Sequence, residues 1–574
     1  MSTLRQSLSY EPQILRFGTS GRRGEVVHLT QLEIYINALA ELRYLQSLPR
    51  ASGGIMPGDD FFYAYDLRPS SIHFVSEQGN HGELAQAIEQ AIRDAAMTPV
   101  NLGCIPTPAL MYYALQRGQG SMMITGSHIP FDRNGYKTNS AKGELLKTDE
   151  APIAAHVEAV REQLYQQAEA ESLFDSSGAL KGGSRKLSAR TADAAEAYIR
   201  RYTDFFSGRS LKGMRLLAYE HSSVGRDLLA ETFRRLGAEV FPAGRSDTFV
   251  PIDTEAIDDH QLAFMQKLTD EAWKKHGKLD AVISTDGDSD RPLILGVDAD
   301  GALGKVRFFG GDLVGMVVAE YLGAGAVVVP ISCNDAIDRG PLKQILEPKT
   351  RIGSPYVIAA MDVARAKGRH RICGWEANGG FLLGSDFSRD GKVLSALPTR
   401  DAILPLAGVL FAAAEQHLSI SALFTRLPRR FSKAALLRQF PRATSLKIIK
   451  RFSPADPLIA DVVFSAGGCS ALDAQGNTLS ISPDMQESCQ QIRRDLARFF
   501  THIAGFGEVV RINYIDGVRV YFSTGDVAHV RPSGNADELR VYAVADAQSR
   551  AEEIAALGVA EPDGILRRLE QAVS

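Results

Sequence analysis

Apolar runs and helical repeats alternate through the first 170 residues of the chain. Short apolar runs cover 61–65, 100–104 and 121–124, and apolar residues recur at helical spacing over 31–45 and 83–96. Strands that alternate with helices in this way are typical of a parallel sheet with helices packed on it. The opening part of the chain is therefore predicted to be an α/β domain.

A polar stretch then interrupts the pattern. Residues 175–190 are rich in glycine and serine, which predicts a linker, and strands at 215–219 and 239–241 flank a helix at 225–236 beyond it. We expect a second α/β domain to begin close to this linker.

Two later segments have clear patterns of their own. Residues 394–418 have helical spacing, and Pro405 is expected to bend or divide that helix. Residues 508–523 alternate between apolar and polar around Asp516-Gly517, which predicts a β-hairpin with a type I′ turn.

Composition narrows the class of protein. The 574 residues are 45% apolar, enough for several cores, and the formal net charge of -4 gives no basic signature for nucleic acid. The five cysteines form no CxxC pair, as expected of a reduced cytoplasmic protein without structural zinc. The first residues lack the apolar core of a signal peptide, and no apolar window of about 18 residues predicts a membrane span.

A hydroxyl group stands where one of the predicted strands ends. The run at 121–124 leads into Thr125-Gly126-Ser127-His128, and Lys137 follows ten residues after Ser127. A strand end is a common position for reactive groups in α/β sheets. Taken alone, these residues favour an ordinary turn over a reactive site.

Three carboxylates alternate in the stretch LDAVISTDGDSDRPLILGV at 279–297. Asp286, Asp288 and Asp290 lie in a turn between two apolar runs, so their side chains can converge on one hard divalent cation. Mg²⁺ suits a phosphate-handling site better than Ca²⁺, and the residues at loop positions 6 and 12 exclude an EF-hand. The alternative is a solvated turn.

Three further loops have the composition of binding sites. Residues 16–24, RFGTSGRRG, and residues 531–535, RPSGN, combine arginine, hydroxyl groups and glycine, as anion-binding loops do. In residues 371–381, RICGWEANGGF, Glu376 lies beside glycines and can accept hydrogen bonds from sugar hydroxyls. A surface turn remains the alternative for residues 16–24, and a glycine-rich turn after a strand remains the alternative for residues 371–381.

In chain order, the loops at Ser127, 286–290, 371–381 and 531–535 resemble the four active-site loops of the α-D-phosphohexomutase superfamily, the phosphomannomutase/phosphoglucomutase family. Residues 16–24 resemble the N-terminal signature of the same family. The resemblance implies that Ser127 is the phosphorylated serine, that Arg23, His128 and Lys137 serve catalysis, and that Ser127 and the three aspartates bind Mg²⁺. It further implies two groups of binding residues. The sugar-binding group is Arg291, Glu376, Asn378 and Gly379, and the phosphate-binding group is Arg531, Ser533, Gly534, Asn535 and Arg540.

The same resemblance implies a fold and a reaction. The expected fold is three similar mixed α/β sheet domains, over 1–185, 186–303 and 304–426, followed by a smaller α+β domain over 427–574, around a central cleft. The expected activity is interconversion of hexose 1-phosphate and hexose 6-phosphate through a phosphoserine and a hexose 1,6-bisphosphate. A sugar phosphate is then the only partner, with no nucleic acid or membrane, and the protein is a monomer or a homodimer.

Some positions depart from the family pattern and leave alternatives open. Gly126 and Ile129 differ from the usual TASHNP loop, and Asn535 with Ala536 differs from the usual Thr and Glu. Ser354 and Gly380 stand where the family often has histidine. The sequence Glu376-Ala377-Asn378-Gly379 is more similar to the corresponding loop of enzymes that act on acetylglucosamine phosphate. A phosphoacetylglucosamine or phosphoglucosamine mutase is therefore one alternative, and a non-catalytic sugar-phosphate-binding protein is another.

Overall fold

The computed structural model describes residues 2–255, 257–300, 303–533 and 537–573. These residues form two compact units. The first contains Met1–Gly325 and Ser354–Phe424, and the second contains Ala326–Gly353 and Thr425–Ser574. Residues 326–353 lie inside the predicted third domain but pack with the C-terminal part of the chain.

The first unit begins with a mixed sheet whose core strands are buried. Its strands are β1 (Arg22–Glu25), β2 (Asp60–Tyr65), β5 (Thr98–Gly103), β6 (Ser121–Ile124), β7 (Arg133–Ser140) and β8 (Gly143–Glu144). They follow the order β1-β7-β6-β2-β5, with β8 beside β7. Strand β2 runs parallel to β5 and β6, which confirms the parallel core predicted for this domain, while β7 is antiparallel to β6.

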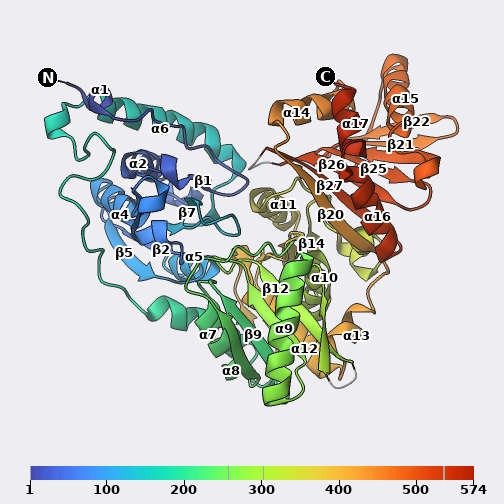
Figure 1. Cartoon of the computed structure of the whole chain (residues 1–574), viewed down its shortest axis with the longest axis horizontal. Coiled ribbons are helices and arrows are strands. Elements are labelled where there is room, and N and C mark those ends of the chain that lie inside the picture. The colour runs from blue at the N-terminus through green and yellow to red at the C-terminus, as the bar shows by residue number, and fades with distance from the viewer. Residues whose placement is uncertain (1, 256, 301–302, 534–536, 574) are drawn as a thin grey trace. The chain divides into compact units, whose positions relative to one another are not determined.

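Helices cover this sheet because their apolar faces share one core with it. The main helices are α2 (Gln31–Ser47), α4 (Leu84–Asp94), α5 (Thr107–Leu115) and α6 (Glu150–Tyr165). Helix α2 contacts both α4 and α6, and Figure 1 shows the three together in blue and teal. Thr30 caps the start of α2 by accepting a hydrogen bond from the backbone N–H of Glu33.

A second mixed sheet follows the linker. Its strands are β9 (Arg215–His221), β10 (Glu239–Arg245), β11 (Ala281–Thr285), β12 (Pro292–Asp300) and β13 (Leu303–Phe308), in the order β10-β9-β11-β12-β13. The accompanying helices are α7 (Asp193–Phe205), α8 (Arg226–Arg235) and α9 (Asp259–His276). Strand β9 is parallel to β10 and β11, whereas β11 and β12 are antiparallel neighbours joined by the aspartate-rich loop.

The rest of the first unit contributes a third sheet region. Strands β15 (Ile372–Trp375), β16 (Phe381–Leu383) and β19 (Leu397–Asp401) pair antiparallel, and β17 (Phe387–Arg389) pairs with β18 (Lys392–Leu394). The helices are α10 (Gly311–Leu322), α11 (Ser354–Ala366), α12 (Ile403–Glu415) and α13 (Ile420–Phe424). The helix predicted over 394–418 is therefore wrong in its first part, which forms strand β19. Pro405 lies in the first turn of α12, where its missing N–H removes no helical hydrogen bond.

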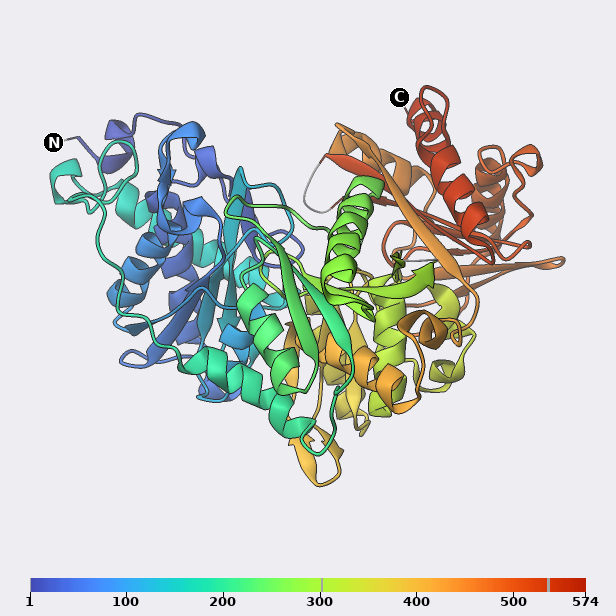
Figure 2. The same cartoon turned by 60° about the horizontal axis from the view of Figure 1, so that its bottom comes forward.

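The second unit is built on an antiparallel sheet. Its strand order is β20-β27-β26-β25-β24-β21-β22-β23, and Figure 2 shows its orange and red helices gathered on one side of the strands. The strands are β20 (Phe431–Arg438), β21 (Asp461–Ser465), β22 (Gly468–Leu472), β23 (Thr478–Leu479), β24 (Val509–Asn513), β25 (Val518–Phe522), β26 (Val527–Pro532) and β27 (Glu538–Ala545). The helices are α14 (Arg442–Arg451), α15 (Pro483–Ala497), α16 (Gln548–Val559) and α17 (Ile565–Gln571).

The hairpin predicted over 508–523 is present as β24 and β25. Its turn is longer than the predicted type I′ turn, because Asn513 pairs with Arg519 and Gly517 has a positive φ whereas Asp516 does not. All five cysteines are free thiols, in line with the sequence. Among the described residues, no helix combines the length and the hydropathy that a membrane crossing requires.

Candidate active site

Ser127 is held in a strained turn directly after strand β6. It is fully buried and has φ +55°, a left-handed conformation that is uncommon for non-glycine residues. Its backbone N–H donates to Thr125 Oγ1 at 2.7 Å, and the Thr125 hydroxyl donates to Asp66 Oδ2 at 2.8 Å. Asp66 follows strand β2, so two parallel strand ends fix the position of the Ser127 hydroxyl. His128 is the next residue and is half-buried.

A buried arginine supports the same turn from the end of β2. Arg68 pairs with Asp66 and donates to the carbonyl oxygens of Ser127, at 3.0 Å, and of Ile129. A Cβ atom added to Gly126 would lie 2.7 Å from the guanidinium carbon of Arg68. Gly126 therefore leaves room for an arginine that orients the serine loop.

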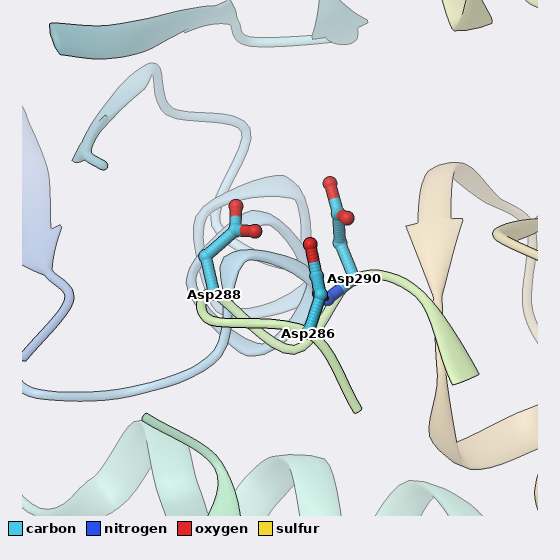
Figure 3. A group of neighbouring side chains, drawn as sticks. All are labelled: Asp286, Asp288 and Asp290. Carbon is cyan, nitrogen blue, oxygen red and sulfur yellow. Dashed lines mark hydrogen bonds between the residues drawn. The ribbon is translucent and has the colours of Figure 1, made fainter. Parts of the chain in front are cut away.

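The three aspartates converge as the sequence predicts. The loop between β11 and β12 directs Asp286, Asp288 and Asp290 to one side, as Figure 3 shows, and one carboxylate oxygen of each lies within 4.8 Å of the others. All three are completely buried. Ser127 Oγ donates to Asp286 Oδ2 at 2.7 Å, which brings the predicted serine and the acidic loop into one site.

Lys137 bridges two of these aspartates. Its ammonium donates to Asp288 Oδ2 and to Asp290 Oδ2, each at 2.7 Å, and the Thr107 hydroxyl donates to Asp288 Oδ2 at 2.6 Å. Burial alone would raise the pKa of Asp288, but Lys137 and Thr107 hold this pKa below its usual value. Asp286 has no ammonium partner in the described part of the chain, and burial together with the charges of Asp288 and Asp290 raises its pKa well above the usual value.

Arg291 and Arg23, two of the predicted site residues, lie near the three aspartates. Arg291 Nε lies 3.8 Å from Asp286 Oδ2 and 3.7 Å from Asp290 Oδ1, and its NH1 lies 3.8 Å from Asp253 Oδ1. Arg23 stands on β1 opposite Gly135 of β7. Burial, followed by the charge of Arg291, lowers the pKa of Arg23 to about 10. Both guanidinium groups therefore border the acidic loop.

The donor set fits a hard divalent cation. Three buried carboxylates meet at one point, and among the described residues Asp288 Oδ1 and Asp290 Oδ1 have no hydrogen-bond partner. Buried carboxylate oxygens without a partner are rare unless an ion or water satisfies them. Oxygen ligands of this kind are those that Mg²⁺ and Ca²⁺ prefer.

The predicted sugar loop lies between β15 and β16 in the same unit. Glu376 is buried and accepts a hydrogen bond from Arg400 NH1 at 2.9 Å. The Asn378 carbonyl accepts from Thr254 Oγ1 at 2.7 Å, and the Gly379 N–H donates to the carbonyl of Glu376 at 2.9 Å. The loop is thus a closed turn, tied at Thr254 to the second sheet domain.

The predicted phosphate residues lie in the second unit. Arg531 of β26 stands directly opposite Arg540 of β27, so both side chains lie on one face of the sheet. Arg531 Nε donates to Asp516 Oδ1 at 3.1 Å, Arg540 NH2 donates to Glu538 Oε2 at 2.9 Å, and the Ser533 N–H donates to the Glu538 carbonyl at 2.9 Å. Gly534 and Asn535 lie outside the described residues.

Comparison with known proteins identifies the family. Models of the phosphoglucomutase/phosphomannomutase family match in three places: α/β/α domain I over residues 15–164, α/β/α domain III over 310–431 and the C-terminal domain over 484–558. A phosphomannomutase of Sinorhizobium fredii is 37% identical over 547 residues, which is 95% of this chain and 98% of that protein. The chain belongs to the phosphoglucomutase/phosphomannomutase family.

Two further comparisons agree with this family. A phosphomannomutase of Salmonella muenchen is 37% identical over 541 residues, covering 94% of this chain and 93% of that protein. The crystal structure of a phosphoglucomutase/phosphomannomutase family protein from Burkholderia thailandensis superposes with a TM-score of 0.62 at 17% identity and covers 98% of each chain. The predicted architecture of three mixed α/β domains and a C-terminal antiparallel sheet domain is therefore confirmed.

Three residues of the site are not predicted from the sequence to have a function: Thr107, Arg68 and Arg400. Thr107 belongs to the Pro106-Thr107-Pro108 turn, which resembles a family motif but gives no sign of a bond to Asp288. Arg68 belongs to a strand-end segment that also resembles the family. The sequence around Arg400 does not indicate a binding residue, because this segment has the apolar spacing of a helix. Arg400 reaches Asp290 and Glu376 through the tertiary fold.

Proposed function

We propose that this protein is a phosphohexomutase that interconverts hexose 1-phosphate and hexose 6-phosphate, with mannose and glucose phosphates as the first substrates to test. The observation that carries the proposal is the bond from Ser127 Oγ to Asp286 inside a buried trio of aspartates. A buried hydroxyl that reaches a divalent-cation site is suited to accept and return a phosphoryl group. Both relatives named above are phosphomannomutases, which favours hexose phosphates over aminosugar phosphates.

In the proposed reaction, phosphorylated Ser127 gives its phosphoryl group to a hydroxyl of the sugar monophosphate. The bond between phosphorus and Ser127 Oγ breaks as the bond to the sugar oxygen forms, which gives a hexose 1,6-bisphosphate. After the bisphosphate turns over in the site, Ser127 Oγ takes back the other phosphoryl group and leaves the isomeric monophosphate. Either His128 or Lys137 transfers the proton of the sugar hydroxyl.

Other residues of the chain bind and orient the sugar phosphate. Asp286, Asp288, Asp290 and Ser127 would hold Mg²⁺, which when bound neutralises charge on the transferring phosphoryl group. Arg23 and Arg291 attract the anionic substrate, and Glu376 with the Asn378-Gly379 turn accepts hydroxyl hydrogen bonds. Arg531, Ser533, Gly534, Asn535 and Arg540 are proposed to bind a phosphate group.

The proposal is tested by incubating the protein with mannose 1-phosphate, glucose 1-phosphate or N-acetylglucosamine 1-phosphate. Each assay contains Mg²⁺ and a trace of the matching bisphosphate, and formation of the 6-phosphate is measured. Conversion of the hexose phosphates supports the proposal, and conversion of the acetylglucosamine compound alone would favour the aminosugar alternative. No conversion of any substrate would favour a binding protein.

The Ser127→Ala variant tests the phosphoserine itself. We expect it to lose turnover while its melting temperature stays close to that of the unchanged protein, because the lost hydroxyl makes one side-chain bond. Full activity in this variant would remove the serine from the mechanism. Cytoplasmic location, a monomeric or homodimeric state, and domain limits at 185, 303 and 426 stay predictions.

A further inference from the structure

The two positions where the family often has histidine face one arginine in this chain. At Gly380, an added Cβ atom would lie 2.5, 2.6 and 2.9 Å from Cδ, Cγ and Cβ of Arg400. Contacts this short are not compatible with ordinary packing. The stem of Arg400 therefore takes the space that a side chain at position 380 would need.

Ser354, the second departure, touches the same side chain. Its hydroxyl donates to Glu144 Oε2 at 2.6 Å and accepts from Arg400 NH1 at 3.3 Å. Ser354 is fully buried. Two small residues thus border the Arg400 side chain where two imidazoles are expected from the family pattern: Gly380 lies against its aliphatic stem and Ser354 against its guanidinium group.

The guanidinium of Arg400 joins the acidic loop to the sugar loop. Its Nε donates to Asp290 Oδ2 at 3.0 Å, and its NH1 donates to Glu376 Oε2 at 2.9 Å. Arg400 is only 2% exposed. Its NH2 lies 3.0 Å from Asp290 Oδ2, yet among the described residues it has no hydrogen bond of acceptable geometry. One buried N–H-bearing nitrogen of Arg400 is therefore without a hydrogen bond in the described part of the chain.

The backbone that carries Arg400 is firmly anchored. Strand β19 pairs with β16 through Phe381 and Asp401, so Arg400 stands beside the end of the sugar loop. The Asp401 carboxylate, next in the chain, accepts hydrogen bonds from the hydroxyls of Tyr198, at 2.6 Å, and Tyr202. A planar guanidinium on such a strand can hold two carboxylates at a fixed separation.

We infer that Arg400 is the positioning residue that replaces the missing histidines: it fixes Glu376 for the sugar hydroxyls and offers NH2 to an oxygen of the hexose phosphate. This inference rests on the proposed function. It explains why position 380 is glycine in this chain, since a larger residue there would displace the side chain of Arg400.

The first test compares Arg400→Ala and Arg400→Lys with the matched variant Arg201→Ala. Arg201 is also a buried arginine, and it donates to Ser395 Oγ at 2.8 Å and to the Ser395 carbonyl at 2.7 Å. Loss of one partner from a buried charged pair corresponds to about a 30-fold or larger effect. We expect Arg400→Ala to lower kcat/KM by that factor. Arg400→Lys should recover only part of the loss, because an ammonium group lacks the planar set of N–H donors with which a guanidinium binds two carboxylates. Arg201→Ala should lower the melting temperature alone.

Two readouts separate positioning from mere stability. Added guanidinium ion, at concentrations well below denaturing ones, should restore part of the activity of Arg400→Ala and none of any loss in Arg201→Ala. Calorimetric titration with glucose 6-phosphate, without added metal, should give a dissociation constant about 10-fold higher for Arg400→Ala than for the unchanged protein. If Arg400→Ala does not fold, both measurements of affinity and rate are made on Arg400→Lys.

The Gly380→Ala variant tests whether position 380 and the Arg400 side chain compete for the same space. Gly380→Ala should impair turnover strongly by itself, and less when Arg400 is already alanine, because Cδ and Cγ of Arg400, which make the two shortest contacts, are then absent. Equal losses in both backgrounds, or unchanged kcat/KM and sugar affinity in Arg400→Ala, would overturn the inference while leaving the mutase proposal intact. An unchanged protein that converts no sugar phosphate would instead overturn the proposed function.

Discussion

Replacement of Lys137 by methionine is the sharpest perturbation of the buried acidic site. The Lys137 ammonium makes two charged hydrogen bonds of 2.7 Å, to Asp288 and Asp290, whose side chains are 0% exposed. Methionine keeps much of the length of the side chain but removes its charge. The variant therefore leaves two buried carboxylates without their ammonium partner.

The expected cost follows from the burial of this pair. Breaking a buried ion pair by removing one partner destabilises a protein by about 3–5 kcal/mol. For a unit of about 400 residues, a loss of 3 kcal/mol lowers the melting temperature by about 4 °C. This shift is expected for the unfolding of the first unit, which contains Lys137, Asp288 and Asp290. Lys147→Met is a suitable control, because Lys147 pairs with Glu150 at a half-exposed site and should cost about 1 kcal/mol or less.

The assay is thermal unfolding with and without Mg²⁺. A ligand that binds only the folded state stabilises it by an amount that grows with its affinity. Without Lys137 the aspartates should attract the cation more strongly, so Mg²⁺ should raise the melting temperature of Lys137→Met by more than that of the unchanged protein. Equal melting temperatures without metal, or equal shifts with Mg²⁺, would refute the assignment of Lys137 as the counter-charge of this site.

Two further predictions concern other parts of the chain. Gly126→Ala should cost about 1–3 kcal/mol and slow turnover, because its Cβ meets the guanidinium of Arg68 at 2.7 Å; unchanged melting and rate would contradict this. Burial lowers the pKa of His529 to about 3, below its unfolded value near 6.5. The stability from neutral His529 is thus complete above pH 6.5 and is lost as the pH falls toward 3, about 2–3 kcal/mol by pH 4.5. His529→Gln should flatten the pH dependence of the urea midpoint over that range, and an unchanged slope would count against it.

The parts of the site that the sequence predicts are those set by short loops after strands. Asp286, Asp288 and Asp290 lie within five residues, so the two strands beside them suffice to bring their side chains together. Ser127 follows a buried strand in the same way. In such cases the local pattern already contains the geometry, and only the pairing of the two loops depends on the fold.

Arg400 shows where local pattern fails. The apolar residues of 394–418 fit a helix, and Pro405 was consistent with a bend in it, yet β19 forms because Asp401 pairs with Phe381 of β16. That pairing joins residues 20 positions apart and cannot be deduced from spacing within one window. Residues 326–353 are a second case, since Ile352 and Asp335 bond to Asp516 and Arg430 of the second unit.

Charge balance explains how so many carboxylates are buried together. Asp288 and Asp290 each have a cationic hydrogen-bond donor, Lys137 for both and Arg400 for Asp290. Among the residues that the structure describes, the Asp286 carboxylate accepts hydrogen bonds from the Ser127 hydroxyl and two backbone N–H groups alone, with Arg291 farther away. Its raised pKa is the consequence, because an uncompensated buried charge favours the neutral form. The carboxylate with the least positive charge around it is therefore Asp286, which accepts the hydrogen bond of the Ser127 hydroxyl. A cation added to this site would lower the pKa of Asp286, the carboxylate beside the proposed phosphoryl acceptor.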